Sequence, residues 1–240
     1  MNKAAFPRKR RLNPLLALRP SWRLWLPLVW GSMVVMLAAL YLHSQPWMGL
    51  TLENKDGQYW GTEGMLLAIN GQPLQAQDLI EDPGAIEDDA HYAQFLQRQT
   101  ALHQALRQPR VVLTWQSASG QTSQRAQSVQ STRPWASFPF VFWLQCAIGW
   151  LCMLIGGWVW VVRPKDWVVR LFSLSGLCVL MFSVSAACYS SRGIALSGED
   201  FSRLAFLNRF GATAYGFAGI AFFLRYPTPI ASLRSLLGLL

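Results

Sequence analysis

The chain has 240 residues, of which 52% are hydrophobic, and its formal net charge is +9. The basic excess lies beside apolar stretches, where the positive-inside bias of membrane proteins explains it, and this placement argues against a nucleic-acid partner. The sequence holds none of the common protease, esterase or phosphate-binding motifs, and its three histidines lack metal-ligand spacing. We therefore expect no catalytic residue, no metal and no cofactor.

Four apolar stretches divide the chain, and they cover residues 24–43, 138–162, 167–189 and 204–224. A helix of about 20 residues crosses the roughly 30 Å hydrocarbon core of a bilayer. The sequence therefore predicts a membrane α-helical bundle of four transmembrane helices. Residues 230–240 are apolar but too short to span, and we expect them to begin a fifth helix in a longer polypeptide.

Charge sets the predicted topology. Residues 1–23 carry seven cations and no acid, so this basic N-terminus is expected in the cytoplasm. Residues 44–137 carry six cations and nine acids and are expected outside, while 190–203 form an outer loop. The first apolar stretch exceeds the core of a cleaved signal peptide, so we favour an uncleaved anchor. These features predict a multi-pass membrane protein with a cytoplasmic N-terminus.

The polar segment 44–137 is long enough for a small α+β domain, inserted between the first two membrane helices. Residues 49–52 alternate weakly and predict a strand, and residues 64–74 predict a strand closed by an Asn-Gly turn. The spacing of apolar residues predicts a helix over 91–106, capped by one of the aspartates before it. Residues 111–115 predict another strand.

This order of elements resembles a PDZ domain of the bacterial type, as do the sequence segments EGMLLAINGQPL and PRVVLTW. In that family a ligand strand lies between the second strand and the long helix, so the resemblance implies that an extracytoplasmic peptide or protein binds between residues 49–52 and 91–102. The groove residues it implies are Gly49, Leu50, Thr51, Leu52, His91, Phe95 and Leu102. The alternative is a domain that binds no ligand and serves as a spacer or dimer contact.

Polar side chains inside the predicted helices are costly in lipid and are functional candidates. Gln145 in the second helix and Asn208 and Arg209 in the fourth lie at similar depths from the outer surface. A contact between Gln145 and Arg209 would form an outward-facing pocket or a coupling point. In the alternative interpretation Arg209 snorkels to the interface and Asn208 stabilises helix packing.

The whole layout, together with FFLRYP at the end of the fourth stretch, is similar to the sensory front of competence-type (ComP-like) quorum-sensing histidine kinases. The resemblance implies a signal-input module of a two-component system, a homodimer in the lipid bilayer of the bacterial inner (cytoplasmic) membrane. Kinase activity is implied only if a kinase core follows residue 240. The first alternative is a non-catalytic membrane-anchored adaptor or scaffold that binds an envelope protein or peptide. A part of a transporter or membrane protease is the second.

Overall fold

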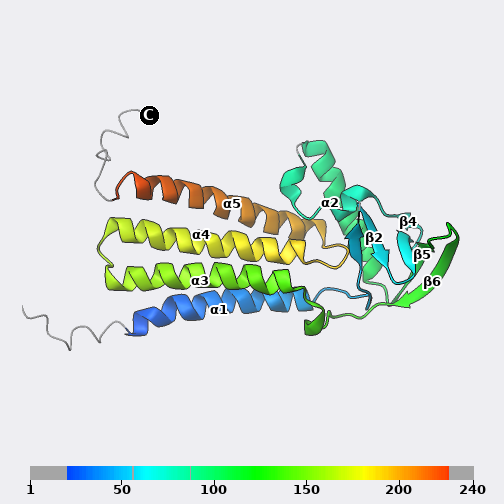
Figure 1. Ribbon diagram of the computed structural model, residues 1–240, viewed down its shortest axis with the longest axis horizontal. Coiled ribbons are helices and arrows are strands. Elements are labelled where there is room, and N and C mark those ends of the chain that lie inside the picture. The colour runs from blue at the N-terminus through cyan, green and yellow to red at the C-terminus, as the bar shows by residue number, and fades with distance from the viewer. Residues whose placement is uncertain (1–20, 56, 87, 227–240) are drawn as a thin grey trace, which may run out of the picture.

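The computed structural model of the chain describes residues 21–55, 57–86 and 88–226. It is a mixed α+β protein in which four long helices lie side by side, in the order α1, α3, α4 and α5 (Figure 1). A small antiparallel sheet and the helix α2 form a domain at one end of these helices. The helix bounds are Ser21–His43 for α1, Asp89–Leu106 for α2, Phe140–Val162 for α3, Trp167–Ser190 for α4 and Gly198–Phe223 for α5.

Three helices are long and apolar enough to cross a membrane: Trp25–His43 in α1, Phe140–Val162 (α3) and Trp167–Ser190 (α4). Their mean hydropathies are 1.8, 1.8 and 2.0. Large apolar side chains cover their outer faces, and Phe140 and Trp158 are 75% and 61% exposed. Such apolar surface is unfavourable in water and favourable in lipid. The structure thus agrees with a membrane protein.

The fourth predicted crossing lies within α5, which does not meet the same hydropathy criterion because Asn208 and Arg209 interrupt it. The connection predicted over 190–203 is shorter in the structure, where only residues 191–197 separate α4 from α5. The helix begins early because the Ser197 hydroxyl accepts a hydrogen bond from the Asp200 amide at 3.2 Å. Acidic residues in its first turn also suit the positive end of the helix dipole. Residues 230–240 lie outside the described residues.

Helices α3 and α4 approach closely where glycines remove the side chain. A Cβ on Gly176 of α4 would lie 2.5 Å from the carbonyl oxygen of Cys152 in α3. A Cβ on Gly156 of α3 would lie 3.1 Å from the Cα of Ser173 in α4. Gly216 of α5, in contrast, has no atom within 4 Å of its Cβ position. Tight packing therefore joins α3 to α4, whereas this face of α5 is open.

The sheet has the order β1-β2-β3-β5-β6, and all its pairs are antiparallel, with β4 paired to β3. The predicted Asn-Gly hairpin is confirmed: Asn70 and Gly71 adopt φ values of 48° and 76° between β3 and β4. The strands of the sheet are β1 Glu53–Lys55, β2 Gln58–Gly61, β3 Gly64–Ile69, β4 Gln72–Pro73, β5 Arg110–Gln116 and β6 Thr122–Ser128.

The predicted long helix is also confirmed, since α2 begins after Asp88, whose side chain accepts a hydrogen bond from the Ala90 amide. The strand predicted over 49–52 is wrong, because the first strand starts only at Glu53. Gly49 turns the backbone with a φ of 73°, and Leu50 and Leu52 pack against the core from an unpaired segment. Residues 49–52 thus form no hydrogen-bonded strand pair, although their apolar residues alternate.

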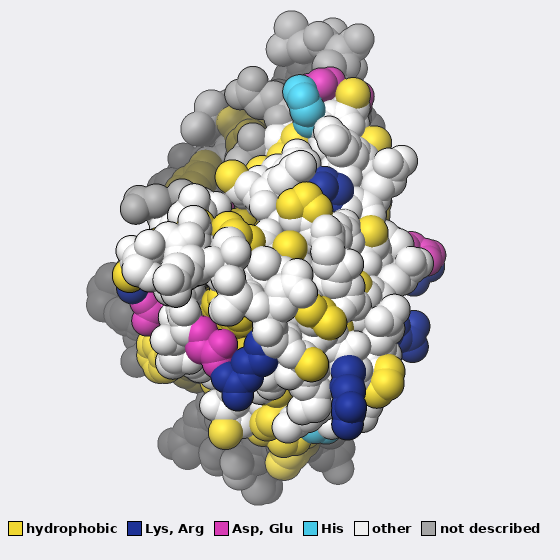
Figure 2. Space-filling view, turned by 90° about the vertical axis from the view of Figure 1, so that its right-hand side faces the viewer, with side chains coloured by type: hydrophobic (Ala, Val, Ile, Leu, Met, Phe, Trp, Pro, Cys, Tyr) yellow, Lys and Arg dark blue, Asp and Glu magenta, His cyan; other side chains and the backbone are white. Residues whose placement is uncertain are grey.

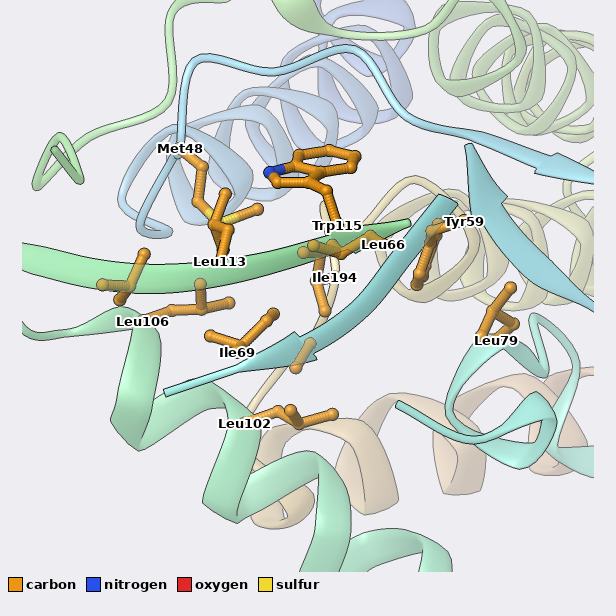
Figure 3. Packing of buried hydrophobic residues seen from close by; sticks show 12 residues of the cluster. Met48, Tyr59, Leu66, Ile69, Leu79, Leu102, Leu106, Leu113, Trp115 and Ile194 are labelled. Carbon is orange, nitrogen blue, oxygen red and sulfur yellow. The ribbon is translucent and has the colours of Figure 1, made fainter. Parts of the chain in front are cut away.

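The core of the domain lies between β3, β5 and α2 (Figure 3). Leu66, Ile69 and Leu113 from the sheet meet Leu102 from α2, and all four are at most 3% exposed. Ile194, from the loop between α4 and α5, enters the same cluster. On the end of the domain that points away from the helices, acidic and basic side chains are scattered over mostly uncharged surface (Figure 2).

Two adjacent β5 residues provide a matched test of this core. Leu113 is 1% exposed and Val112 is 41% exposed. We expect Leu113→Ala to lower the free energy of unfolding by about 2–5 kcal/mol, because it removes buried methyl groups and leaves a cavity. Val112→Ala should cost less than about 1 kcal/mol. Hydrogen exchange of β3 and β5 amides in the full chain measures both, and equal losses would contradict this core assignment.

Candidate functional site

The candidate site is the junction at which the α4–α5 loop, residues 191–197, enters the sheet domain. Ile194 and Ala195 are each 4% exposed and belong to the same apolar cluster as Leu102. Leu196 is fully buried in a second cluster with Phe95 and Phe201. The loop therefore completes the domain core, so sheet domain and helices share their apolar interior.

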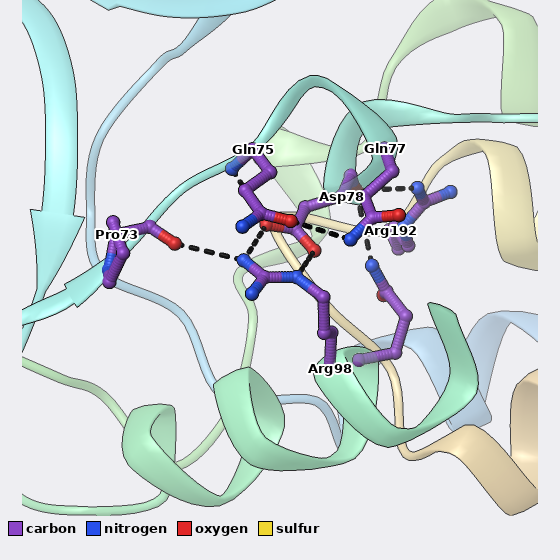
Figure 4. A network of polar contacts seen from close by, with 7 residues as sticks. Pro73, Gln75, Gln77, Asp78, Arg98 and Arg192 are labelled. Carbon is purple, nitrogen blue, oxygen red and sulfur yellow. Dashed lines mark hydrogen bonds and ion pairs between the residues drawn. The ribbon is translucent and has the colours of Figure 1, made fainter. Parts of the chain in front are cut away.

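A polar network beside this loop is centred on Asp78, which is fully buried (Figure 4). Its carboxylate accepts hydrogen bonds from the Arg98 Nε and Nη2 atoms at 2.7 and 2.6 Å, and from the Gln75 amide at 2.9 Å. The hydrogen-bonded ion pair raises the pKa of Arg98. The Asp78 carbonyl accepts from the Gln99 amide group and from Arg192. One residue of the short 3-10 helix Ala76–Leu79 thus joins α2 to the α4–α5 loop.

Arg192 is the charged residue of the loop and is 8% exposed. Its guanidinium donates to the carbonyl oxygens of Ile80 at 2.6 Å, Tyr189 at 2.9 Å and Asp78 at 3.2 Å, and lies 5.2 Å from the centre of the Phe201 ring. Its Nε has no hydrogen-bond partner among the described residues. Burial lowers the pKa of Arg192, although nearby Tyr59 and acids oppose the effect.

A second buried arginine, Arg133, lies in the segment between β6 and α3 and is 5% exposed. It donates to the Ser191 carbonyl, and to the carbonyl and hydroxyl of Ser137 at 2.9 and 3.1 Å. The Trp47 ring lies 4.8 Å from it. Burial lowers the pKa of Arg133 to about 10. No ion pair with an acid is formed by Arg133 within the described part of the chain.

Both guanidiniums border a cavity of about 380 Å³ between the segment 46–54 and the α4–α5 loop. Its apolar wall includes Trp47, Leu50 and Leu52, and its polar wall includes both arginines. Such a chamber accommodates a molecule with one apolar part and one polar end. It lies at the junction rather than along the outer face of α2.

The predicted groove residues lie in different environments. Leu50 and Leu52 are half-buried against the cluster that contains Leu102, whereas Phe95 packs against Phe201 in the second cluster. Leu102 and Phe95 are fully buried and offer no surface to an added strand. The side of α2 that the resemblance assigns to a ligand is thus occupied by the chain itself.

The other predicted groove residues lie at the surface. Gly49 and Thr51 are exposed beside the apolar cluster. His91 is exposed at the start of α2, where its Nδ1 atom lies 3.0 Å from an Asp88 carboxylate oxygen. No group of His, Cys, Asp and Glu able to hold a metal occurs among the residues that the structure describes.

The structure does not bring the intramembrane candidates together. Arg209 donates to the Pro83 carbonyl at 3.2 Å and lies 5.5 Å from the Tyr92 ring centre, so it contacts the domain. Asn208 donates to the carbonyl of Phe182 in α4 at 2.9 Å. Gln145 lies in α3, on the far side of α4 from α5, and its buried amide oxygen has no partner in the described chain (Figure 1).

Asp78, Arg133 and Arg192 were missed as site residues by the sequence analysis. Their contacts join segments far apart in the chain, and no short motif marks them. Arg133 and Arg192 did carry one signal: each is a cation in a segment predicted to lie outside, against the positive-inside bias. The predicted outer segments hold eight cations, however, so this signal does not single out these two.

Comparison with protein-family models, with curated proteins and with solved structures finds no match to this chain. Its function must therefore be argued from this fold and this junction.

The Asp78–Arg98 ion pair provides a test of the network. Arg98→Met should lower the free energy of unfolding by about 3–5 kcal/mol, because it leaves the buried Asp78 carboxylate without its charged partner. Arg110→Met, at an exposed arginine of β5, should change it by less than about 0.5 kcal/mol. Adding Asp78→Leu to Arg98→Met should recover part of the loss. Equal stabilities of the two arginine variants would contradict the assigned role.

His103 predicts a pH dependence of the same junction. Burial lowers the pKa of this α2 histidine, while the backbone of Ala195 in the loop acts against that shift. The unfolded chain then takes up the proton at a higher pH than the folded chain, so stability falls as the pH drops below about 6.5. Thermal unfolding at pH 7.5 and 5.5 should show a smaller loss in His103→Gln than in wild type. If His103→Gln loses as much stability as wild type between these two pH values, His103 is not the source of the dependence.

Proposed function

We propose that this chain is a signal-input module of the bacterial inner membrane, with its N-terminus in the cytoplasm and its sheet domain outside. In this proposal α5 is the fourth crossing, and the PDZ-like domain detects an extracytoplasmic peptide or protein. The chain would be the front part of a two-component sensor histidine kinase of the ComP-like type, active as a homodimer. A kinase core following residue 240 would supply the output.

The observation that carries the proposal is the shared interior of domain and helices. The α4–α5 loop contributes Ile194 and Ala195 to the domain core, and Arg192 bonds the domain backbone. A spacer that merely stands outside the membrane does not need such a joint. Since the loop leads directly into two helices, a shift of the domain must move the ends of α4 and α5.

A second connection joins the domain to the end of α1 and the start of α3. The Arg133 amide donates to the carbonyl of His43, the last residue of α1, at 2.8 Å. The rings of His43 and Trp135 stack with their centres 4.8 Å apart, just before α3 begins. The domain is thus fixed to the ends of all four long helices. A ligand that prefers one arrangement of these ends would shift the bundle between two states.

The charge pattern supports the proposed orientation. Arg163, Lys165 and Arg170 lie at the α3–α4 turn, at the end of the bundle opposite the domain. The Asp166 side chain accepts a hydrogen bond from the Val168 amide and caps α4 there. A basic turn facing the cytoplasm agrees with the positive-inside bias.

The adaptor alternative is less well supported. An adaptor needs no coupling between its domain and the membrane helices, whereas here the α4–α5 loop completes the domain core.

A fusion experiment tests the proposal. The chain, joined after residue 240 to the kinase core of a well-behaved sensor, drives a reporter gene. Ile194→Asp places a charge in the shared core and should change basal output severalfold at unchanged membrane level, because it displaces the loop. Arg110→Gln, at an exposed site of β5, should leave output unchanged. If Ile194→Asp alters neither output nor its response to cell extracts, the module does not transmit a signal.

A further inference from the structure

The cavity at the junction is lined by two buried arginines and by little opposite charge. Its wall carries two guanidiniums that are 5% and 8% exposed, those of Arg133 and Arg192. Glu81 is the one acid among the described residues that line it. Removing a guanidinium from water is costly unless an opposite charge or a full set of hydrogen bonds replaces the water.

Neither arginine is fully satisfied by the described chain. An arginine has five N–H groups, and Arg133 donates three of them, to Ser191 and to two atoms of Ser137. The Nε of Arg192 has no partner, nor does the buried hydroxyl of Ser190, which lines the same cavity. Arg133 therefore keeps two N–H groups that no described residue accepts, whereas the Arg192 Nε and the Ser190 hydroxyl are buried behind the cavity wall.

Both guanidiniums are held in place by the surrounding chain. Arg133 bonds the carbonyl of Ser191, the residue directly before Arg192. Trp47 and Phe138 flank the Arg133 guanidinium, at 4.8 and 5.4 Å from their ring centres. Their positions are thus set before any ligand arrives, which lowers the entropic cost of binding an anion.

Most of the remaining lining is apolar. Trp47, Met48, Leu50 and Leu52 from the segment before β1, with Tyr59 from β2, line the chamber. The two guanidiniums and the Glu81 carboxylate give the whole lining a net charge of +1, which suits a monoanion better than a dianionic phosphate. A volume of about 380 Å³ holds a short chain of apolar groups beside the charged end.

We propose that this chamber binds a carboxylate carried on an apolar body, with the carboxylate at the arginine-bearing part of its lining. A medium-chain fatty acid and the free C-terminus of an apolar peptide share this chemistry. The inference rests on the proposed sensor function only for its consequence: the ligand would join the segment before β1 to the α4–α5 loop and so set the arrangement of the helix ends.

The test measures binding to the full chain in lipid nanodiscs by equilibrium dialysis. The probes are octanoate and an N-acetylated trileucine with a free carboxylate; the neutral partners are octanamide and the trileucine amide, and inorganic phosphate is the third arm. The carboxylates should bind about tenfold to a hundredfold more tightly than the amides, as charged hydrogen bonds predict. The tighter of the two carboxylates identifies the source, lipid or peptide.

Three variants locate the binding. Arg133→Gln should remove the preference for carboxylate over amide. Gly193→Leu should abolish binding by filling the chamber, since a Cβ at Gly193 points toward the Trp47 ring at 3.8 Å. Arg110→Gln, with the same loss of charge at the surface of β5, should bind as wild type. Hydrogen exchange of β3 and β5 confirms that each variant is folded.

The proposal is overturned if no carboxylate binds, if amide and carboxylate bind equally, if phosphate binds best, or if folded Gly193→Leu binds as wild type. Its failure is distinguishable from that of the sensor function. Carboxylate binding with no change in fusion output retains the site and rejects the sensor, whereas output that depends on Ile194 without carboxylate binding does the reverse.

Discussion

The buried guanidinium of Arg192 is the constraint on which the rest of the structure depends. A charge at this depth is tolerable only while the carbonyls of Asp78, Ile80 and Tyr189 surround it. Those carbonyls come from the sheet domain and from the end of α4. The domain can therefore move relative to the helices only if the carbonyls move with the guanidinium or if the charge finds other partners. A joint of this kind favours a few discrete arrangements over a continuum.

The sheet domain is not a self-contained folding unit, because the α4–α5 loop completes its core. Residues 44–137 contain the whole sheet and α2, yet their core is closed by Ile194 and Ala195, which lie beyond two membrane-length helices. Without that loop, apolar surface around Leu102 and Phe95 would face water, at a cost proportional to its area. Folding of the domain and assembly of the helices are thus coupled, and a segment excised at the limits of the sheet would lack part of its interior.

Local signals predicted the local structure well. The α2 helix, its aspartate cap and the Asn70–Gly71 turn depend on interactions within a few residues, and each was predictable from sequence. The segment 49–52 was not, because pairing of a strand depends on partners that periodicity does not reveal. The early start of α5 depends on Ser197, a cap that the hydropathy of the following residues concealed. Arg133 and Arg192 act across long stretches of sequence, so only the folded chain could identify them.

The contact of Arg209 with Pro83 has a mechanical consequence. At the first residue of α5, the Gly198 amide donates to the Thr100 hydroxyl of α2 at 2.9 Å. Arg209 lies eleven residues further along the helix, or about 16 Å at 1.5 Å per residue. A rod held at one point can swing freely about that point, whereas a rod held at two separated points follows its holder in both tilt and twist. The domain can therefore impose torque on α5 as well as displacement along its axis.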